Sequence, residues 1–127
     1  MLARPALLAT IDEYFGVHPA VTLSGPRQCG KTTLAWEFAS RTAGVTFFDL
    51  EDATDRKRLT EPEQTLRPLT GLVIIDEIQR QPALFETLRV LLDRPDEPAR
   101  FLLLGSASPD IIRGVSESLA GRAGVVD

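Results

Sequence analysis

The sequence has little of what marks secreted, membrane or nucleic-acid-binding proteins. Its one cysteine cannot form an internal disulfide, which is compatible with a reducing compartment such as the cytoplasm. No apolar run approaches the roughly 20 residues that a membrane-spanning helix requires. The formal net charge of -4 gives no general electrostatic argument for a nucleic-acid or membrane surface. We therefore expect a soluble, cytoplasmic protein, and a nucleic-acid partner is not indicated.

The chain has the size and composition of one α/β domain, spanning residues 1–127. It is 43% hydrophobic and 25% charged, which allows a real core and leaves no room for a second domain of ordinary size. Nearly continuous apolar runs, typical of parallel strands covered on both faces, occur at 20–24, 45–50, 72–76 and 101–104. Helical spacing of apolar residues is found at 7–15, 34–39 and 84–92. A further apolar run starts at 123 and is cut short, so we expect the front part of a longer polypeptide.

A glycine-bounded loop follows the first expected strand and opens a helix. It consists of Gly25, Pro26, Arg27, Gln28, Cys29, Gly30, Lys31, Thr32 and Thr33. The spacing G-x-x-x-x-G-K-T lets backbone N–H groups wrap a phosphate at a helix N-terminus. In such a loop Lys31 would reach the β- and γ-phosphates and Thr32 would place its hydroxyl on Mg²⁺. The alternative is a plain turn with a solvent-facing lysine, which the flanking strand and helix disfavour.

We assign no catalytic or binding role to two further features, Cys29 and the basic run 56–58. Cys29 lies near a helix N-terminus and a lysine, where a thiol pKa can be low, but no neighbouring histidine supplies a base. We interpret it as a small loop filler. The basic run 56–58 stands beside acidic residues and is interpreted as a solvated helix face rather than a binding patch.

Two acids end the third apolar run. An acid in the place of Asp76 would order the Mg²⁺ shell of a phosphate-loop enzyme, and Glu77 could then act as the base that orients the attacking water. Taken alone, such a pair is usually a helix-capping or solvated turn. The upstream phosphate loop, at a distance that fits one intervening βα unit, favours the functional interpretation.

Two other strand ends carry polar residues whose role stays open. Asp49, Glu51 and Asp52 follow the second strand, where ligands bind in parallel sheets. They could hold a metal-bound water or contact a partner, although capping of the next helix by Asp49 or Asp52 is the favoured role. Ser106 follows the fourth strand and could hydrogen-bond the γ-phosphate or its water. A plain helix-capping loop before Pro109 is an equally good account of that segment.

Four segments in this order resemble a known family: LSGPRQCGKTTL at 23–34, IIDEIQ at 74–79, LGSAS at 104–108 and ESLAGR at 117–122. Together they resemble the prokaryotic AAA-type P-loop ATPases, with Walker A and Walker B motifs in the first two. The resemblance implies a three-layer, mainly parallel sheet of about five strands in the order 5-1-4-3-2, the last one truncated. It also implies ATP as the nucleotide and a C-terminal domain that this chain does not contain.

The resemblance also bears on two further site residues. It makes Arg122 the candidate arginine that neutralises charge on the transferred phosphate, across a subunit interface if the protein forms a homo-oligomer. Its alternative role is an exposed residue before the last strand. The sensor strand of the family often ends in a hydroxyl residue where Leu104 stands here, which leaves Ser106 as the nearby substitute.

We therefore expect an enzyme that binds MgATP and hydrolyses it, with Lys31 on the phosphates, Thr32 and Asp76 on Mg²⁺, and Glu77 activating water. The main alternative is a nucleotide-dependent switch with negligible hydrolysis. A kinase would need an acceptor pocket and an arginine-rich lid, which 56–67 could supply, but the Asp76–Glu77 pair favours water activation. No base-reading segment for guanine is visible.

Overall fold

Strands and helices alternate along most of the chain, as the apolar patterns predict. The computed structural model describes residues 4–25, 30–42, 44–95, 99–106, 113, 117, 119 and 121–126. The elements are α1 (Arg4–Phe15), β1 (Ala20–Gly25), α2 (Lys31–Ala39), β2 (Val45–Asp49), α3 (Ala53–Arg58), α4 (Pro62–Leu66), β3 (Gly71–Asp76), the 3₁₀ turn η1 (Ile78–Arg80), α5 (Ala83–Leu92), β4 (Ala99–Ser106) and β5 (Ala123–Val126).

The strands form a single parallel sheet. Within the described residues the sheet has five strands in the order β2-β3-β4-β1-β5, and every neighbouring pair is parallel. Read from the other edge this is 5-1-4-3-2, so the predicted topology and the three-layer α/β P-loop fold are confirmed. Because parallel strands all end at the same edge, the segments that follow β1 and β3 are brought to one side of the molecule.

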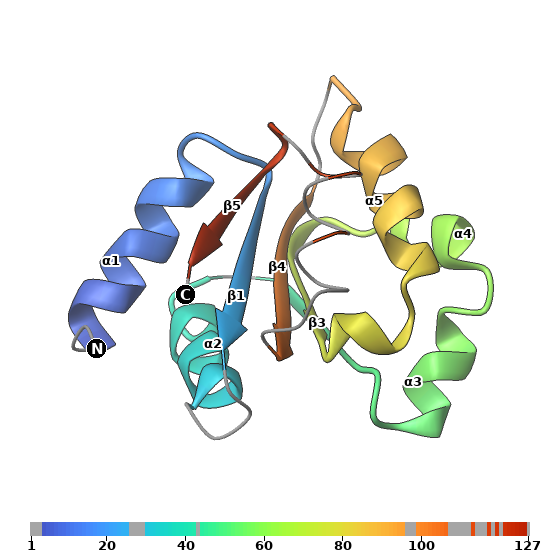
Figure 1. The fold of residues 1–127 in the computed structure, drawn as a ribbon, viewed down its shortest axis with the longest axis horizontal. Coiled ribbons are helices and arrows are strands. Elements are labelled where there is room, and N and C mark those ends of the chain that lie inside the picture. The colour runs from blue at the N-terminus through green and yellow to red at the C-terminus, as the bar shows by residue number, and fades with distance from the viewer. Residues whose placement is uncertain are drawn as a thin grey trace.

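Helices cover both faces of the sheet (Figure 1). Successive residues of a strand point to opposite faces, and β3 shows this alternation directly. Its Leu72 and Ile74 belong to the core shared with α1 and α2, whereas Val73 and Ile75 belong to the core shared with η1 and α5. Both faces of the central strands are therefore buried, as their continuous apolar character requires.

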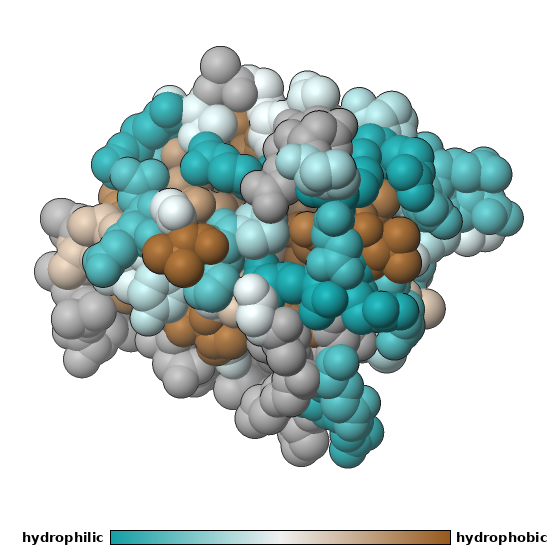
Figure 2. Space-filling view, turned by 90° about the horizontal axis from the view of Figure 1, so that it is seen from above, coloured by the Kyte–Doolittle hydropathy of each residue, from teal (hydrophilic) through white to brown (hydrophobic). Residues whose placement is uncertain are grey.

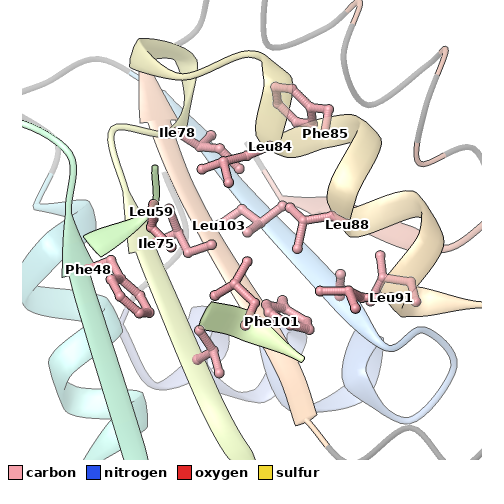
Figure 3. Packing of buried hydrophobic residues seen from close by; sticks show 14 of the residues in the cluster. Phe48, Leu59, Ile75, Ile78, Leu84, Phe85, Leu88, Leu91, Phe101 and Leu103 are labelled. Atoms are coloured by element: carbon pink, nitrogen blue, oxygen red, sulfur yellow. The ribbon is translucent and has the colours of Figure 1, made fainter. Parts of the chain in front are cut away.

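Helix α5 is held by one apolar stripe. Its buried residues recur at helical spacing and are Leu84, Phe85, Leu88, Leu91 and Leu92. Figure 3 shows several of them packed over Ile75, Phe101 and Leu103 of the sheet. Full burial of one such side chain contributes about 1.5–3 kcal/mol, so packing rather than helix propensity holds this element in place.

The segment between β2 and β3 is mostly exposed. Asp52 caps α3 by accepting a hydrogen bond from the backbone N–H of Thr54 at 2.8 Å, and Pro62 opens α4 in its first turn. None of the residues of α3 is buried. Within the described residues, none of the helices is long and apolar enough to cross a membrane.

Helix α1 sits against β5 at a position that only glycine fits. A Cβ built on Gly124 would lie 2.6 Å from Cδ2 of Tyr14 and 3.2 Å from Cδ2 of His18. The first contact is with the body of an aromatic ring rather than with a flexible side-chain end. The close approach of α1 to the edge strand therefore depends on the absence of a side chain at this position.

We expect the Gly124→Ala substitution to lower the free energy of unfolding by about 1–3 kcal/mol, because the new methyl group overpacks the ring of Tyr14. Urea unfolding, followed by the fluorescence of Trp36, measures the change. Val125→Ala is the control on the same strand, since Val125 is 43% exposed and its truncation should change stability little. A Gly124→Ala variant as stable as the wild type would show that the helix can move away from the strand without penalty.

Candidate active site

The candidate site lies where β1 and β3 end and α2 begins, at the lower edge of the sheet in Figure 1. Gly30 has φ 79°, in the left-handed region that favours glycine, and α2 starts at the next residue. The backbone N–H of Leu34 donates to the carbonyl oxygen of Gly30 at 2.9 Å, which closes the first turn. Of the predicted phosphate loop, residues 26–29 lie outside the described residues.

A hydrogen bond joins the two predicted Mg²⁺ residues. The hydroxyl of Thr32, in the first turn of α2, donates to Oδ2 of Asp76, at the end of β3, at 2.9 Å. The two residues are 44 positions apart in the sequence and are brought together only by the sheet. The structure thus places the first turn of α2 and the end of β3 in direct contact.

Burial raises the pKa of Asp76 above its ordinary value. The negative charges of Glu77 and Asp49 raise it further, and the hydrogen bond from Thr32 acts in the opposite direction. Asp49 lies beside Asp76 in the sheet, because the two residues pair across β2 and β3. Burial and these two neighbouring charges together outweigh the hydrogen bond from Thr32, so the pKa stays above its ordinary value.

Glu77 has an unusual backbone conformation. Its φ of 58° and ψ of 47° are left-handed, and it is the only non-glycine residue with positive φ in the described part of the chain. Such a conformation costs on the order of 1–2 kcal/mol. Two features hold it: the backbone N–H of Arg80 donates to the carbonyl oxygen of Glu77 at 3.0 Å, and Ile78 is completely buried. The strained residue is a candidate catalytic group, which is where such strain is commonly found.

An open pocket of about 260 Å³ gathers the candidate residues. Its lining consists of Lys31, Thr32, Asp49, Glu51, Asp76 and Glu77. Among the described residues of this lining, Lys31, only 6% exposed, is the cationic side chain, and four residues carry carboxyl groups. These carboxyl groups would repel a phosphate chain, and a divalent cation bound with the phosphates would offset that repulsion.

The donor set suits Mg²⁺. Thr32 and Asp76 offer a hydroxyl and a carboxylate oxygen, which are hard ligands of the kind that Mg²⁺ prefers. Among the described residues, no group of three or more His, Cys, Asp or Glu side chains forms a metal cage. Mg²⁺ is usually bound by one or two carboxylates together with substrate phosphates and water, so this incomplete set fits a metal that arrives with a nucleotide.

Two features of the site were not assigned by sequence reasoning. The side-chain amide of Gln79 donates from Nε2 to Oε2 of Glu77 at 2.6 Å. Glu51 and Asp49 line the pocket, and Oδ1 of Asp49 accepts a hydrogen bond from the backbone N–H of Glu51 at 2.9 Å. The position of Asp49 and Glu51 after β2 was the sequence signal that could have pointed to the pocket, but it was interpreted as helix capping. In the structure, Asp52 caps α3.

The structure does not bring Arg122 to this pocket within one chain. Arg122 precedes β5, at the edge where the strands begin, and its guanidinium donates to Asp93 at 2.6 and 3.0 Å. This pairing lowers the pKa of Asp93 and raises that of Arg122, mainly through the hydrogen bonds. Figure 2 looks onto that side of the molecule, which is mostly hydrophilic with small separate apolar areas. Ser106 ends β4 beside Gly25 of β1, at the pocket edge of the sheet, and its side chain lies outside what the structure describes.

The raised pKa of Asp76 predicts a pH dependence of stability. A carboxyl group whose folded-state pKa exceeds its unfolded value of 3.8 binds protons more tightly in the folded protein. Its contribution to stability is therefore present below pH 3.8 and is lost as pH rises through the folded-state pKa. We expect Asp76→Asn to gain stability relative to the wild type across that window and to keep the gain above it.

Urea unfolding at a series of pH values, in the presence of EDTA, measures this difference. Asp12→Asn, on an exposed position of α1, is the control for removal of one negative charge. A stability difference between Asp76→Asn and the wild type that shrinks with rising pH would contradict the prediction, because it would indicate a lowered folded-state pKa.

Solved structures share the fold. The Walker-type ATPase PABY2304 of Pyrococcus abyssi matches with a TM-score of 0.72 at 17% identity, over 99% of this chain and 53% of that chain. A DNA replication initiation factor matches with a TM-score of 0.58 at 19% identity, over 99% of this chain and 46% of that one. At these identities the likeness establishes the architecture.

Curated relatives and a family model match the sequence itself. Uncharacterized proteins of Mycobacterium tuberculosis (Rv2008c) and Mycobacterium bovis (Mb2031c) are each 54% identical over 109 residues, which is 86% of this chain. The chain spans about a quarter of their length, 24% in each case. A family model described as an AAA domain matches residues 17–127, which include the pocket residues and the whole sheet. The chain therefore belongs to the AAA domain family and has the fold of its P-loop ATPases.

Proposed function

We propose that this domain binds MgATP and hydrolyses it to ADP and phosphate. One observation carries the proposal: the Thr32–Asp76 hydrogen bond places the start of α2 beside the end of β3, with Lys31 and Glu77 lining the same pocket. Membership of the AAA domain family supports ATP as the ligand. The acidic lining supports a nucleotide that is bound together with a cation.

The phosphates would be held by the loop and by the start of α2. We assign this role to the backbone of residues 25–33, whose last members, Lys31, Thr32 and Thr33, form the first turn of α2. Lys31 would pair with the β- and γ-phosphate oxygens, and its burial against the pocket restricts where its ammonium group can go.

Thr32 and Asp76 would hold Mg²⁺, which when bound supplies neutralisation of phosphate charge. Glu77 would accept a proton from the attacking water. The water oxygen would bond to the γ-phosphorus as the bond between that phosphorus and the ADP oxygen breaks. The left-handed turn at Glu77 allows two successive residues, Asp76 and Glu77, to face the same pocket. Metal binding and water activation can therefore be served by adjacent positions.

Two further residues complete the proposal. Ser106, at the end of β4, would contact the γ-phosphate or its water from the sensor strand. Arg122 would act on the phosphate of a neighbouring copy in a homo-oligomer, because within its own chain it lies at the opposite edge of the sheet. An arginine suits this role because its guanidinium stays charged and grips phosphate oxygens in pairs.

We expect Glu77→Gln to lower kcat for Mg²⁺-dependent phosphate release by about 10²- to 10⁴-fold, because the base is removed while the pocket shape is kept. ATP affinity, measured by isothermal titration calorimetry, should remain. Glu86→Gln, on an exposed position of α5, is the matched control and should turn over as the wild type does.

Phosphate release from Glu77→Gln at the wild-type rate would reject Glu77 as the base. ATP binding by the wild type without any phosphate release would reject hydrolysis by this domain, and would favour the nucleotide-dependent switch.

The role of Arg122 predicts that specific activity rises with protein concentration. We expect Arg122→Ala to abolish that rise, whereas Asp93→Asn, which breaks the same ion pair from the other side, should keep it. Phosphate release over a range of protein concentrations measures both variants. The same concentration dependence of specific activity in the two variants would show that Arg122 has no role beyond its ion pair with Asp93.

A further inference from the structure

The side-chain amide of Gln79 is hydrogen-bonded to the side chain of Glu77. Its Nε2 donates to Oε2 of Glu77 at 2.6 Å, across only one intervening residue. A carboxylate accepts hydrogen bonds but cannot donate them, so the NH₂ group of the amide must face it. The oxygen of the amide, Oε1, is then turned away and buried, with no hydrogen-bond partner among the described residues.

The stability of the fold does not explain why a glutamine is present at position 79. A buried acceptor without a partner is unfavourable, and an apolar side chain of similar size would avoid the problem. Gln79 is also absent from the pocket lining, so it does not meet a ligand there directly. What its amide does contact is the carboxylate of the strained residue, Glu77, which lines the pocket.

A second glutamine, Gln81, provides a comparison because its side chain has a purely structural contact. Gln81, two residues further along, is partly buried like Gln79. Its Nε2 donates to the backbone carbonyl oxygen of Leu59 at 2.9 Å and so ties the segment after β3 to the end of α3. Gln81 therefore satisfies a backbone group of a buried residue, whereas Gln79 is bonded to a side chain of the pocket.

We propose that Gln79 is a positioning residue for hydrolysis: its amide holds one carboxylate oxygen of Glu77 and thereby aims the other at the attacking water. The inference rests on the proposed function of Glu77 as the base. A glutamate has three side-chain torsions, and a hydrogen bond to one oxygen removes most of the freedom that would misdirect the other. The bond lies within a tight turn, because Glu77 is the left-handed residue that precedes the 3₁₀ turn η1 and Gln79 is the second residue of that turn.

The test compares Gln79→Leu with Gln81→Leu. We expect Gln79→Leu to lower kcat by about 10- to 100-fold, which is the size of one hydrogen bond to a charged group, with KM and calorimetric ATP affinity unchanged. Its urea midpoint should stay close to that of the wild type, because removal of the unpaired buried oxygen offsets the loss of the hydrogen bond to Glu77, whose carboxylate faces an open pocket. Gln81→Leu should show the reverse: a lower urea midpoint with kcat unchanged.

A double variant tests whether Gln79 acts through Glu77. If it does, Glu77→Gln combined with Gln79→Leu should turn over no more slowly than Glu77→Gln alone, since the residue to be positioned is already lost. A further loss of the full Gln79→Leu factor in the double variant would overturn the proposal.

The remaining outcomes distinguish the positioning role of Gln79 from ATP hydrolysis by the domain. A Gln79→Leu variant with the wild-type kcat, or one that loses activity only in parallel with stability, overturns the positioning role and leaves hydrolysis intact. A wild-type protein that binds ATP without releasing phosphate overturns hydrolysis first and the positioning role with it. The wild-type measurement therefore distinguishes which proposal has failed.

Discussion

The hydrogen bond between Thr32 and Asp76 is the contact on which the candidate site depends. It connects the first turn of α2 to the end of β3, two elements that are separated by a whole βα unit in the chain. The contact exists because all strands of the sheet are parallel, so that β1 and β3 end at the same edge. A register shift of one residue in β3 would turn Asp76 to the other face of the sheet and leave Thr32 without this partner.

Charge is the second constraint. Among the described residues of the pocket, one buried lysine stands with four carboxyl groups, and burial, together with the charges of Glu77 and Asp49, raises the pKa of Asp76. The left-handed conformation of Glu77 adds backbone strain at the same place. The apolar cores on the two sheet faces hold this edge in position, since Ile78 and α5 anchor the segment that follows Glu77. Backbone strain and like charges thus meet at the site, and a cation bound with a nucleotide would offset the repulsion between the carboxyl groups.

Much of the architecture could be predicted. The strand at β3 is a continuous apolar run, and α5 repeats its apolar residues at helical spacing, so both follow from local patterns. The strand order was available through the resemblance of four motifs to a family, not from periodicity. The pairing of Thr32 with Asp76 could be anticipated in the same way. The bond from Gln79 to Glu77 could not, because residues two apart on a helix do not face each other, and nothing in the residue type of a glutamate indicates the left-handed conformation found here.

The sequence by itself determined the elements and the phosphate-loop spacing, because hydrophobic periodicity, glycine placement and capping residues act over a few neighbouring positions. Only the tertiary structure decided which distant side chains meet. It placed Asp49 and Glu51 in the pocket beside Asp76, and it placed Arg122 at the far edge of the sheet, paired with Asp93. The physical reason is that such contacts depend on strand register and on the packing of helices against both sheet faces, which sum interactions over the whole chain.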